Sequence, residues 1–337
     1  MKILVDAFGG DHAPEEVIKG AVLAVNERQG FEVVLVGKQE VIENLLANEK
    51  YDKDRISVLN ADEVITCEEE PTVAIRRKPN SSISLGFKTL KEQDDVKAFV
   101  SAGSTGAFLV GATLKLGRIQ GVNRPAPCPV LPTLVGDKQV FLTDSGANPD
   151  SKPINICQFA IMGSVYAEAM GVKNPKVALL SNGTEDEKGN ALNHEVFPLL
   201  KNMKTINFVG NIEARDILSG DYDVVVTDGF AGNVALKSIE GAVNGVLKLL
   251  KTSIYSSLSG KIGGLFLKKT FKALKDKLDY NKKGGAIFLG VNKTVIKTHG
   301  SAKREAIKAT IFQAVDYADF NISDTIKERL EQENLEF

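Results

Sequence analysis

Seventeen consecutive residues without a charged side chain, Ala98–Leu114, constrain the fold of this chain more than any other stretch. The run AFVSAGSTGAFLVGATL overlaps the apolar segment Val96–Val100, which predicts a buried strand. Small polar residues follow at Ser101–Gly106, and apolar residues then resume at helical spacing. The polar cluster inside the run and its short apolar flanks argue against a membrane-spanning helix. The stretch therefore predicts a strand, a tight turn and a helix of an α/β domain.

The turn in this stretch is suited to an anion. Small residues let backbone N–H groups and hydroxyls approach a ligand closely, and the positive end of a helix dipole favours negative charge. The candidate binding residues of this turn are Ser101, Gly103, Ser104, Thr105 and Gly106.

Length and composition place the chain among globular enzymes. A chain of 337 residues can hold one large core or two lobes. Charged residues make up 25% of it and hydrophobic residues 43%, which is typical of a globular protein. Cys67, Cys128 and Cys157 lie far apart without a CxxC spacing, so we expect neither a disulfide framework nor a zinc site. The N-terminus lacks the long apolar region of a signal peptide, and we expect a cytoplasmic protein.

Predicted strands and helices alternate along most of the chain. Beside Val96–Val100, strands are expected at Ile3–Phe8, Glu32–Gly37, Arg55–Ala61, Lys176–Leu180, Thr205–Val209 and Asp223–Val226. Helices are expected at Pro14–Asn26, Gln39–Asn48, Ser82–Lys91, Pro153–Met170, from Val234 onward, and at Ala302–Leu330 behind a cap at His299–Ser301. This alternation implies a parallel sheet that helices cover on both faces.

Two segments interrupt the alternation. Proline enrichment makes Ala126–Pro132 unsuited to a central strand. Thr133–Val135 and Gln139–Thr143 predict a β-hairpin, which we expect at a sheet edge or a subunit contact. Gly284–Leu289 and Lys293–Lys297 predict a second strand pair.

Polar turn residues follow five of the predicted strands, after Val5, Val100, Leu142, Leu180 and Val226. In an open parallel sheet, ligands bind beyond the carboxyl ends of the strands. We therefore expect these loops to line one active cleft, although the same residue types are also ordinary in turns. Outside the turn after Val100, the candidate binding residues are Gly9, Gly10, Asn148, Asn182, Gly183, Thr184, Asp228, Gly229 and Gly232.

The glycine spacing in these loops favours an isolated phosphate over a nucleotide. No loop matches the dinucleotide fingerprint GxGxxG or the Walker A pattern GxxxxGK[ST]. The nearest motifs are Gly103-x-x-Gly106 and Gly229-x-x-Gly232, and both are too short for those patterns.

Metal binding and covalent catalysis receive little support. Asp6, Asp11 and His12 could converge on a cation, but a helix N-cap is the stronger interpretation of Asp11. Asp144 and Asp228 fit the role of turn caps equally well. The chain has no GxSxG elbow and no cysteine in a reactive context, so we do not expect an acyl-enzyme.

The remaining candidates for chemistry are histidines and lysines. We expect His194 at the surface, because the helix around it is polar. His12 and His299 stand beside glycines at loop-to-helix junctions, where structural hydrogen bonding and catalysis both fit. Lys152 and Lys237 are candidates for neutralising substrate charge, with a solvated surface position as the alternative.

Positive charge is concentrated in Lys248–Lys283, which holds ten lysines and two aspartates. The segment carries +8 in a chain of net charge −1, which leaves −9 for the rest. Apolar residues at helical spacing predict an amphipathic hairpin of helices that bends at Gly263–Gly264. Its apolar tip and basic face comprise Leu265, Phe266, Leu267, Lys268, Lys269, Lys272 and Lys275. Contact with an anionic membrane and a packed or dimeric helix pair both remain open, whereas nucleic acid is not indicated.

Several ordered motifs carry a resemblance to a known family: VDAFGGDHAP, SAGSTGA, RPAPCPVLPT, DSGAN, QFAIMGSVYAE, NGTEDEKGN, NFVGNIEARD, VVVTDGFAGNVALK and IKTHGSA. Over about residues 1–325 the chain resembles the bacterial phosphate acyltransferase family, the acyl-ACP:phosphate acyltransferases of phospholipid synthesis. One departure is Ser145, which stands where the family often has a second aliphatic residue before the GAN triplet.

The resemblance implies an activity, a fold and an assembly. The family transfers a long-chain acyl group from acyl carrier protein to inorganic phosphate, which gives an acyl phosphate for glycerol-3-phosphate acylation. Its fold is a three-layer α/β/α arrangement similar to isocitrate/isopropylmalate dehydrogenases and phosphotransacetylases. A member of the family is normally a homodimer associated peripherally with the membrane. We expect the same of this chain, with the basic hairpin inserted in a single α/β domain or in one of two lobes.

The resemblance also implies how the site works. Phosphate is a nucleophile and a thioester has a good leaving group, so no cofactor or metal is expected. The hypothesis is direct attack by a phosphate that the Ser101–Gly106 and Asp228–Asn233 loops hold, with Asn233 among the catalytic residues. Lys152 would neutralise charge, while Asp6 or His12 would orient or deprotonate the phosphate.

A carrier protein that is acidic needs a basic docking surface. Arg76, Arg77 and Lys78 compete for this role with the basic face of the hairpin. Two other functions stay open: a metal- and NAD-dependent hydroxyacid dehydrogenase on the same fold, and a non-catalytic membrane scaffold that keeps an anion pocket.

Overall fold

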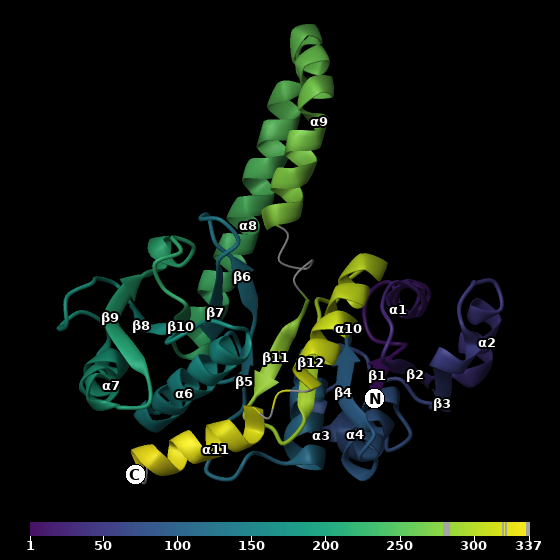
Figure 1. Ribbon diagram of the computed structural model, residues 1–337, viewed down its shortest axis with the longest axis horizontal. Helices are drawn as coiled ribbons and strands as arrows, with labels where there is room; N and C mark the ends of the chain where they lie inside the picture. Colours follow the sequence, from purple (N-terminus) through teal and green to yellow (C-terminus); the bar gives the residue numbers. More distant parts are fainter. Residues whose placement is uncertain (279–283, 319, 321, 335–337) are drawn as a thin grey trace.

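The computed structural model describes residues 1–278, 284–318, 320 and 322–334, and its strands form two sheets where the sequence predicts one (Figure 1). The order in the seven-stranded sheet is β3 (Ile56–Asn60), β2 (Glu32–Gly37), β1 (Lys2–Asp6), β4 (Val96–Ser101), β12 (Thr294–Lys297), β11 (Ala286–Leu289) and β5 (Ala126–Cys128). The order in the five-stranded sheet is β6 (Val130–Pro132), β7 (Gln139–Thr143), β10 (Val224–Val226), β8 (Lys176–Ser181) and β9 (Asn207–Glu213). Neighbouring strands are parallel except where β11 and β6 pair, so the predicted mostly parallel α/β class is confirmed.

Helices cover both faces of the seven-stranded sheet. α1 (Glu15–Glu27) and α10 (Arg304–Ala318) pack on the face to which Ile3 and Val5 point. α4 (Ser82–Glu92) and α5 (Thr105–Gly111) pack on the opposite face, to which Leu4 points. Successive side chains of a strand alternate between faces, and the three consecutive apolar residues Ile3–Val5 of β1 therefore fit burial on both sides. The short helices α2 (Gln39–Leu46) and α3 (Pro71–Arg77) complete this part of the chain.

The five-stranded sheet is covered in the same way. α6 (Pro153–Ala169), α7 (Ala191–Asn202) and α11 (Ile322–Glu333) lie over one face. The first turns of α8 (Gly229–Ile254) lie over the other, where Leu236 packs against Leu142 and Val225.

One continuous apolar core joins the two sheets. Side chains from both sheets belong to it, together with α6, whose residues from Asn155 to Ala167 are all buried. Inside this core Tyr166 Oη on α6 donates a hydrogen bond to Tyr317 Oη on α10 at 2.9 Å. The two sheets therefore share one core.

The proline-rich segment at residues 125–132 connects the sheets. Its first part is β5 at the edge of one sheet, and its second part is β6 at the edge of the other. The prediction that this segment avoids a central position is confirmed. The predicted hairpin exists as well, but its first strand is Val130–Pro132 rather than Thr133–Val135. The second strand pair is also confirmed, since β11 and β12 are antiparallel neighbours.

Two predicted helix boundaries are wrong. The helix expected over Ala302–Leu330 is two helices, because α10 packs against α1 whereas α11 turns away to pack against α6. The helix expected from Val234 begins five residues earlier, at Gly229. Asp228 is its N-cap, and its Oδ1 accepts hydrogen bonds from the N–H groups of Phe230 and Ala231, both at 2.9 Å.

The predicted helical hairpin projects from the body of the molecule as α8 and α9 (Leu258–Leu278) (Figure 1). Its turn lies at residues 255–257, so the bend predicted at Gly263–Gly264 is wrong. Gly260 and Gly264 instead face the end of α8, where a Cβ at Gly260 would overlap the Ile254 carbonyl oxygen. Residues 279–283 and the Lys275 side chain lie outside the described residues. No helix in the described ranges combines the length and apolarity that crossing a membrane requires.

Candidate active site

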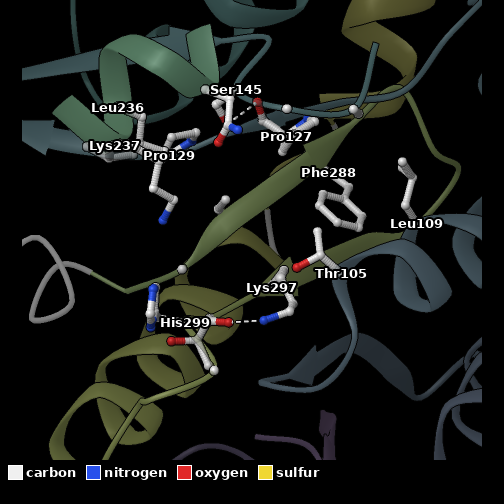
Figure 2. Close-up of a pocket in the computed structure, with 18 of the residues that line it drawn as sticks. Thr105, Leu109, Pro127, Pro129, Ser145, Leu236, Lys237, Phe288, Lys297 and His299 are labelled. Carbon is white, nitrogen blue, oxygen red and sulfur yellow. Dashed lines mark hydrogen bonds between the residues drawn. The ribbon is translucent and has the colours of Figure 1, made fainter. Parts of the chain in front are cut away.

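A cavity of about 570 Å³ lies where the carboxyl ends of strands from the two sheets meet (Figure 2). From the seven-stranded sheet it is lined by the first turn of α5 and by the residues that end and follow β12. From the five-stranded sheet it is lined by the loop after β7 and the start of α8, and Pro127 and Pro129 of the connecting segment close one wall. The polar side chains of the lining include Thr105, Asn233, Lys237, Glu240, Lys297, Thr298 and His299.

The loops on the seven-stranded side are held by close backbone packing. A Cβ at Gly9 would lie 2.6 Å from the Gly103 nitrogen and 2.9 Å from Ser101 Oγ, so only glycine lets the loop after β1 rest on the loop after β4. Gly10 has φ of +103°, a backbone conformation that side chains disfavour. The next N–H group, of Asp11, donates to the Gly300 carbonyl oxygen at 2.8 Å. These contacts tie together the loops after β1, β4 and β12.

Asp6 stands behind these loops rather than in the cavity. It is buried, and it accepts hydrogen bonds from Ser101 Oγ (2.6 Å) and the Phe8 N–H group (3.3 Å). Burial raises the pKa of Asp6, while those donors oppose the change. Ser101 Oγ in turn accepts from the Gly103 N–H group at 2.9 Å. Asp6 and Ser101 therefore shape the turn after β4, and neither belongs to the lining of the cavity.

On the five-stranded side a second buried carboxylate lies at the equivalent place, at the end of a strand and behind the loop that lines the cavity. Asp144 follows β7 directly and accepts hydrogen bonds from the N–H groups of Gly146 (3.0 Å), Ala147 (3.1 Å) and Asn148 (2.6 Å). Burial raises the pKa of Asp144, and the N–H donors oppose that shift. Asn148 Nδ2 also donates to the Pro125 carbonyl oxygen at 2.9 Å. Asn148 is thus occupied in fixing the loop, and Asp144 is the turn cap that the sequence allowed.

The start of α8 presses against this loop. A Cβ at Gly229 would lie 2.7 Å from the Asn148 nitrogen, and one at Gly232 would overlap the Asp144 carbonyl oxygen. The Gly229 N–H group donates to the Asn148 carbonyl oxygen (2.8 Å), and the Gly232 N–H group donates to the Asp228 carbonyl oxygen (3.0 Å). Because Asp228 also caps the two amides between them, the first four amides of α8 already have acceptors. The side chain of Asn233, not this backbone, faces the cavity.

The charges that line the cavity are mostly positive. Lys237 extends from α8 toward the strand end that carries His299 (Figure 2). Its Nζ is 2.8 Å from Glu240 Oε2, so the two side chains form an ion pair and the positive charge of Lys237 is compensated. His299 Nδ1 lies 2.8 Å from Ser301 Oγ and accepts from the Ser301 N–H group at 3.2 Å, which assigns the proton of the neutral ring to Nε2. Burial, followed by the charge of Lys237, lowers the pKa of His299.

Sequence reasoning missed several polar residues of the lining, among them Glu240, Thr298 and the buried Lys297. Only 8% of its surface is exposed, and burial lowers its pKa to about 8. A signal for it was present: Lys297 ends the predicted strand Lys293–Lys297, directly after the apolar pair Val295 and Ile296. A lysine in a buried strand position, next to a polar loop, is uncommon unless it has a partner or a function.

A second cavity of about 1210 Å³ lies on the other side of α8. It is lined by Asn182 and Asp228 among the predicted binding residues, together with the exposed apolar side chains of Phe230 and Val234. The predicted common cleft is therefore only partly formed: the loops after Val100, Leu142 and Val226 share the first cavity. The loop after Val5 packs behind that cavity, and the loop after Leu180 faces the second one.

Several predicted residues lie outside the linings of both cavities. Lys152 is exposed at the start of α6, and His12 is exposed in the loop before α1. Asp11 is exposed as well, and the N-cap position of α1 belongs to Pro14, so the N-cap interpretation of Asp11 is wrong. His194 is at the surface, as predicted. The others outside both linings are Gly9, Gly10, Ser101, Gly103, Ser104, Asn148, Gly183, Thr184, Gly229 and Gly232.

The predicted docking residues are at two separate places. Arg76 and Arg77 are exposed at the end of α3, whereas Lys78 forms an ion pair with Glu69 at 2.7 Å. The apolar residues of the hairpin are exposed, with Leu265 at 70% and Phe266 at 81%. The lysines predicted beside them are exposed too, namely Lys268, Lys269 and Lys272.

Solved structures with a similar fold define the class. The EutD phosphotransacetylase from Staphylococcus aureus superposes with a TM-score of 0.63 at 18% identity, covering 94% of each chain. A 4-hydroxythreonine-4-phosphate dehydrogenase from Klebsiella pneumoniae gives a TM-score of 0.56 at 13% identity, covering 94% of this chain and 99% of that one. The chain thus has the dehydrogenase-like α/β fold that its motifs implied.

Sequence relatives define the family. A family model described as "Fatty acid synthesis protein" matches residues 1–325. The phosphate acyltransferase of Clostridium tetani is 46% identical over 332 residues, 98% of each chain, and that of Bacillus cereus strain B4264 is 45% identical over all of both chains. This protein is an acyltransferase, and it belongs to the family of these phosphate acyltransferases.

Proposed function

We propose that the protein transfers a long-chain acyl group from acyl carrier protein to inorganic phosphate, and that the acyl phosphate feeds phospholipid synthesis. The observation that carries the proposal is the cavity between the sheets, whose lining brings Asn233, Lys237, Lys297 and His299 together. A site with this excess of positive charge and donors suits an anionic nucleophile. The names of the relatives support phosphate as the acceptor.

The proposed reaction needs only positioning and charge stabilisation. A phosphate oxygen attacks the thioester carbonyl carbon, so that a C–O bond forms and negative charge develops on the carbonyl oxygen. The C–S bond then breaks, the carrier leaves as a thiolate, and solvent water protonates it. Asn233 and the Nε2–H group of His299, which both line the cavity, would donate to the oxyanion. Holding both reactants in the cavity supplies the rest of the rate.

The proposal changes the roles of three residues. Lys152 loses the charge-neutralising role first given to it, because it lies outside the lining of the cavity, whereas Lys237 lines the cavity in an ion pair with Glu240. Asp6 acts through Ser101 as a positioning residue, since it is buried behind the turn. The exposed position of His12 favours a structural role for that side chain.

The carrier protein would dock beside α3. A Cβ at Gly106 would lie 2.6 Å from Pro71 Cγ, so α3 begins directly against the residue that lines the cavity. Arg76 and Arg77 are exposed on the same short helix. Replacing both with Glu should raise KM for acyl carrier protein at least tenfold at low salt and leave KM for phosphate unchanged. Replacing Lys268 and Lys269 with Glu is the control, and a larger effect there would move the dock to the hairpin.

The hairpin would contact an anionic membrane as part of a peripherally associated homodimer. Leu265, Phe266 and Leu267 expose apolar surface next to three lysines, which is the composition of an interfacial helix. Replacing the three apolar residues with Gln should abolish co-flotation with vesicles that contain anionic lipid. Sedimentation of the same variant separates the alternatives: a loss of the dimer with unchanged flotation would assign these residues to the subunit contact.

The test of the function itself is the release of free thiol from long-chain acyl carrier protein with and without phosphate. We expect release that requires phosphate and yields acyl phosphate in equal amount. Release that ignores phosphate, or no release, would contradict the proposal. A change in nicotinamide absorbance that requires a divalent cation would favour the dehydrogenase alternative.

A further inference from the structure

Lys297 occupies an unusual place in the seven-stranded sheet. It ends β12, where it is aligned with Ser101 of β4 on one side and with Ala286 of β11 on the other. The two residues before it, Val295 and Ile296, are fully buried. Lys297 is 92% buried, so its side chain stays inside the protein as theirs do. Its side chain is among those that line the cavity (Figure 2).

The ammonium group is incompletely satisfied by the protein. Among the residues that the structure describes, Lys297 Nζ donates only to the carbonyl oxygen of Thr298, and no carboxylate lies within ion-pair distance. An ammonium carries three N–H donors, so two of them have no acceptor among the described residues. The acidic groups that act on Lys297 are, in order of effect, Cys67, Asp6 and Asp11, and the Asp6 oxygens already accept from Ser101 and Phe8. A buried cation in this state is costly unless an anion completes it.

The neighbouring Thr298 side chain is unsatisfied too. Thr298 is 1% exposed, lines the same cavity, and its Oγ1 has no hydrogen-bond partner in the described part of the chain. Buried hydroxyls normally have a partner, and one without it beside a cation indicates a missing ligand. The other lysine of the cavity, Lys237, is balanced by Glu240 at 2.8 Å. The uncompensated positive charge is therefore at Lys297.

We propose that Lys297 Nζ and Thr298 Oγ1 form the binding site for the phosphate nucleophile. The proposal rests on the proposed function, and it places the nucleophile at the end of β12 rather than in the glycine turns after β4 and β10. Two N–H groups and one hydroxyl suit the oxygens of a tetrahedral dianion. Hydrogen bonds between charged partners are stronger than hydrogen bonds between neutral groups. Held there, phosphate uses a further oxygen to attack the thioester carbonyl carbon. The C–O bond forms as the C–S bond breaks, and the carrier thiolate leaves.

The experiment measures KM for phosphate and KM for acyl carrier protein separately in the thiol-release assay. Lys297→Gln should raise KM for phosphate about 30-fold and leave KM for the carrier within twofold, because one charge-assisted contact is lost. Thr298→Val, which removes the hydroxyl at constant size, should raise KM for phosphate about fivefold. Lys293→Gln removes a lysine from the other end of the same strand pair and should change neither constant.

Further measurements make the result independent of a folding defect. Propylammonium added to Lys297→Ala should restore at least a tenth of the lost phosphate affinity, which an unfolded variant could not show. Phosphate titrated into the wild-type protein without acyl donor, followed by calorimetry, should show binding that Lys297→Gln lacks.

Two outcomes would overturn the assignment. One is an unchanged KM for phosphate in Lys297→Gln. The other is a fall in kcat alone, which would place Lys297 at the thioester oxygen instead. Failure of the proposed function is distinguishable from both, since the wild-type protein would then release no phosphate-dependent thiol.

Discussion

Gly229→Ala tests whether the contact between α8 and the loop after β7 sets the geometry of the cavity. The first residue of α8 meets that loop so closely that a Cβ would lie 2.7 Å from the Asn148 nitrogen, 2.8 Å from Asp144 Oδ2 and 2.9 Å from the Asn148 carbonyl carbon. Two of these atoms, the Asn148 nitrogen and Asp144 Oδ2, form a hydrogen bond of 2.6 Å with each other. A methyl group at residue 229 therefore has to displace a polar cluster that is already bonded.

The size of the effect follows from these distances. Ordinary contacts of a Cβ begin near 3.4 Å, so α8 and the loop have to separate by about 0.7 Å. Neither a flexible side-chain end nor empty space absorbs this shift. Overpacking of this kind costs about 1–3 kcal/mol of unfolding free energy. Asn233 and Lys237 move with α8, and a displacement approaching 1 Å at reacting groups lowers turnover by up to about 100-fold.

The assay is urea unfolding together with the phosphate-dependent release of thiol. Gly241→Ala is the matched control in the same helix, since nothing lies within 4 Å of its Cβ, and it should raise stability by about 0.5–1 kcal/mol without a change in turnover. A Gly229→Ala protein with wild-type stability and turnover would refute the claim that this contact fixes the site.

Three further predictions concern charge and hydrogen bonding. The Arg304 guanidinium lowers the pKa of Glu16 to about 2, so Glu16→Gln should cost about 1 kcal/mol of unfolding free energy at pH 7. Urea unfolding of the two proteins should show this difference in stability in full above pH 4.5, and the difference should disappear as the pH falls toward 2. Burial lowers the pKa of Lys297 to about 8, so KM for phosphate should rise about fivefold between pH 8 and pH 9, and Lys297→Arg should remove the rise. That titration should be run with Cys67→Ser, because a thiolate there would alter the charge facing Lys297; the other groups facing it are Asp6, Asp11 and Lys237. Tyr317→Phe removes the acceptor of the 2.9 Å hydrogen bond from Tyr166 Oη and the hydrogen bond that Tyr317 Oη donates to Met170 Sδ. It should cost about 2 kcal/mol by thermal unfolding, because the buried Tyr166 O–H group loses its acceptor.

Periodicity was enough to predict the elements and the class of the fold, because most strands are buried on both faces and most helices on one. It could not divide the strands between two sheets. That division depends on the connecting segment at residues 125–132, whose prolines exclude a central strand without saying which edges it joins. Periodicity did not reveal the break between α10 and α11 either, because the break results from packing: α10 packs against α1, whereas α11 packs against α6.

The candidate site was predictable in its loops but not in its side chains. Glycines and hydroxyl residues after strands identified the turns that meet at the cavity, because such turns need small residues. Whether a polar group faces a ligand or its own backbone depends on hydrogen bonds that spacing does not encode. Asp228 and Asn148 are occupied by the chain itself, whereas Lys297, which looked like the end of an ordinary strand, faces the cavity.

The two buried aspartates explain how a site for an anion can be built from loops that contain acids. Asp6 ends β1 and Asp144 follows β7, one in each sheet, and both accept N–H or O–H groups from the loops that border the cavity. A carboxylate in the lining, about 4 Å from a phosphate, would oppose binding by about 4 kcal/mol per charge pair. Turned away from the cavity, the same carboxylates fix the loops while their charge is separated from the ligand. Glu240, the acid among the described residues of the lining, is paired with Lys237, and this arrangement leaves Lys297 as the group that sets the sign of the field in the cavity.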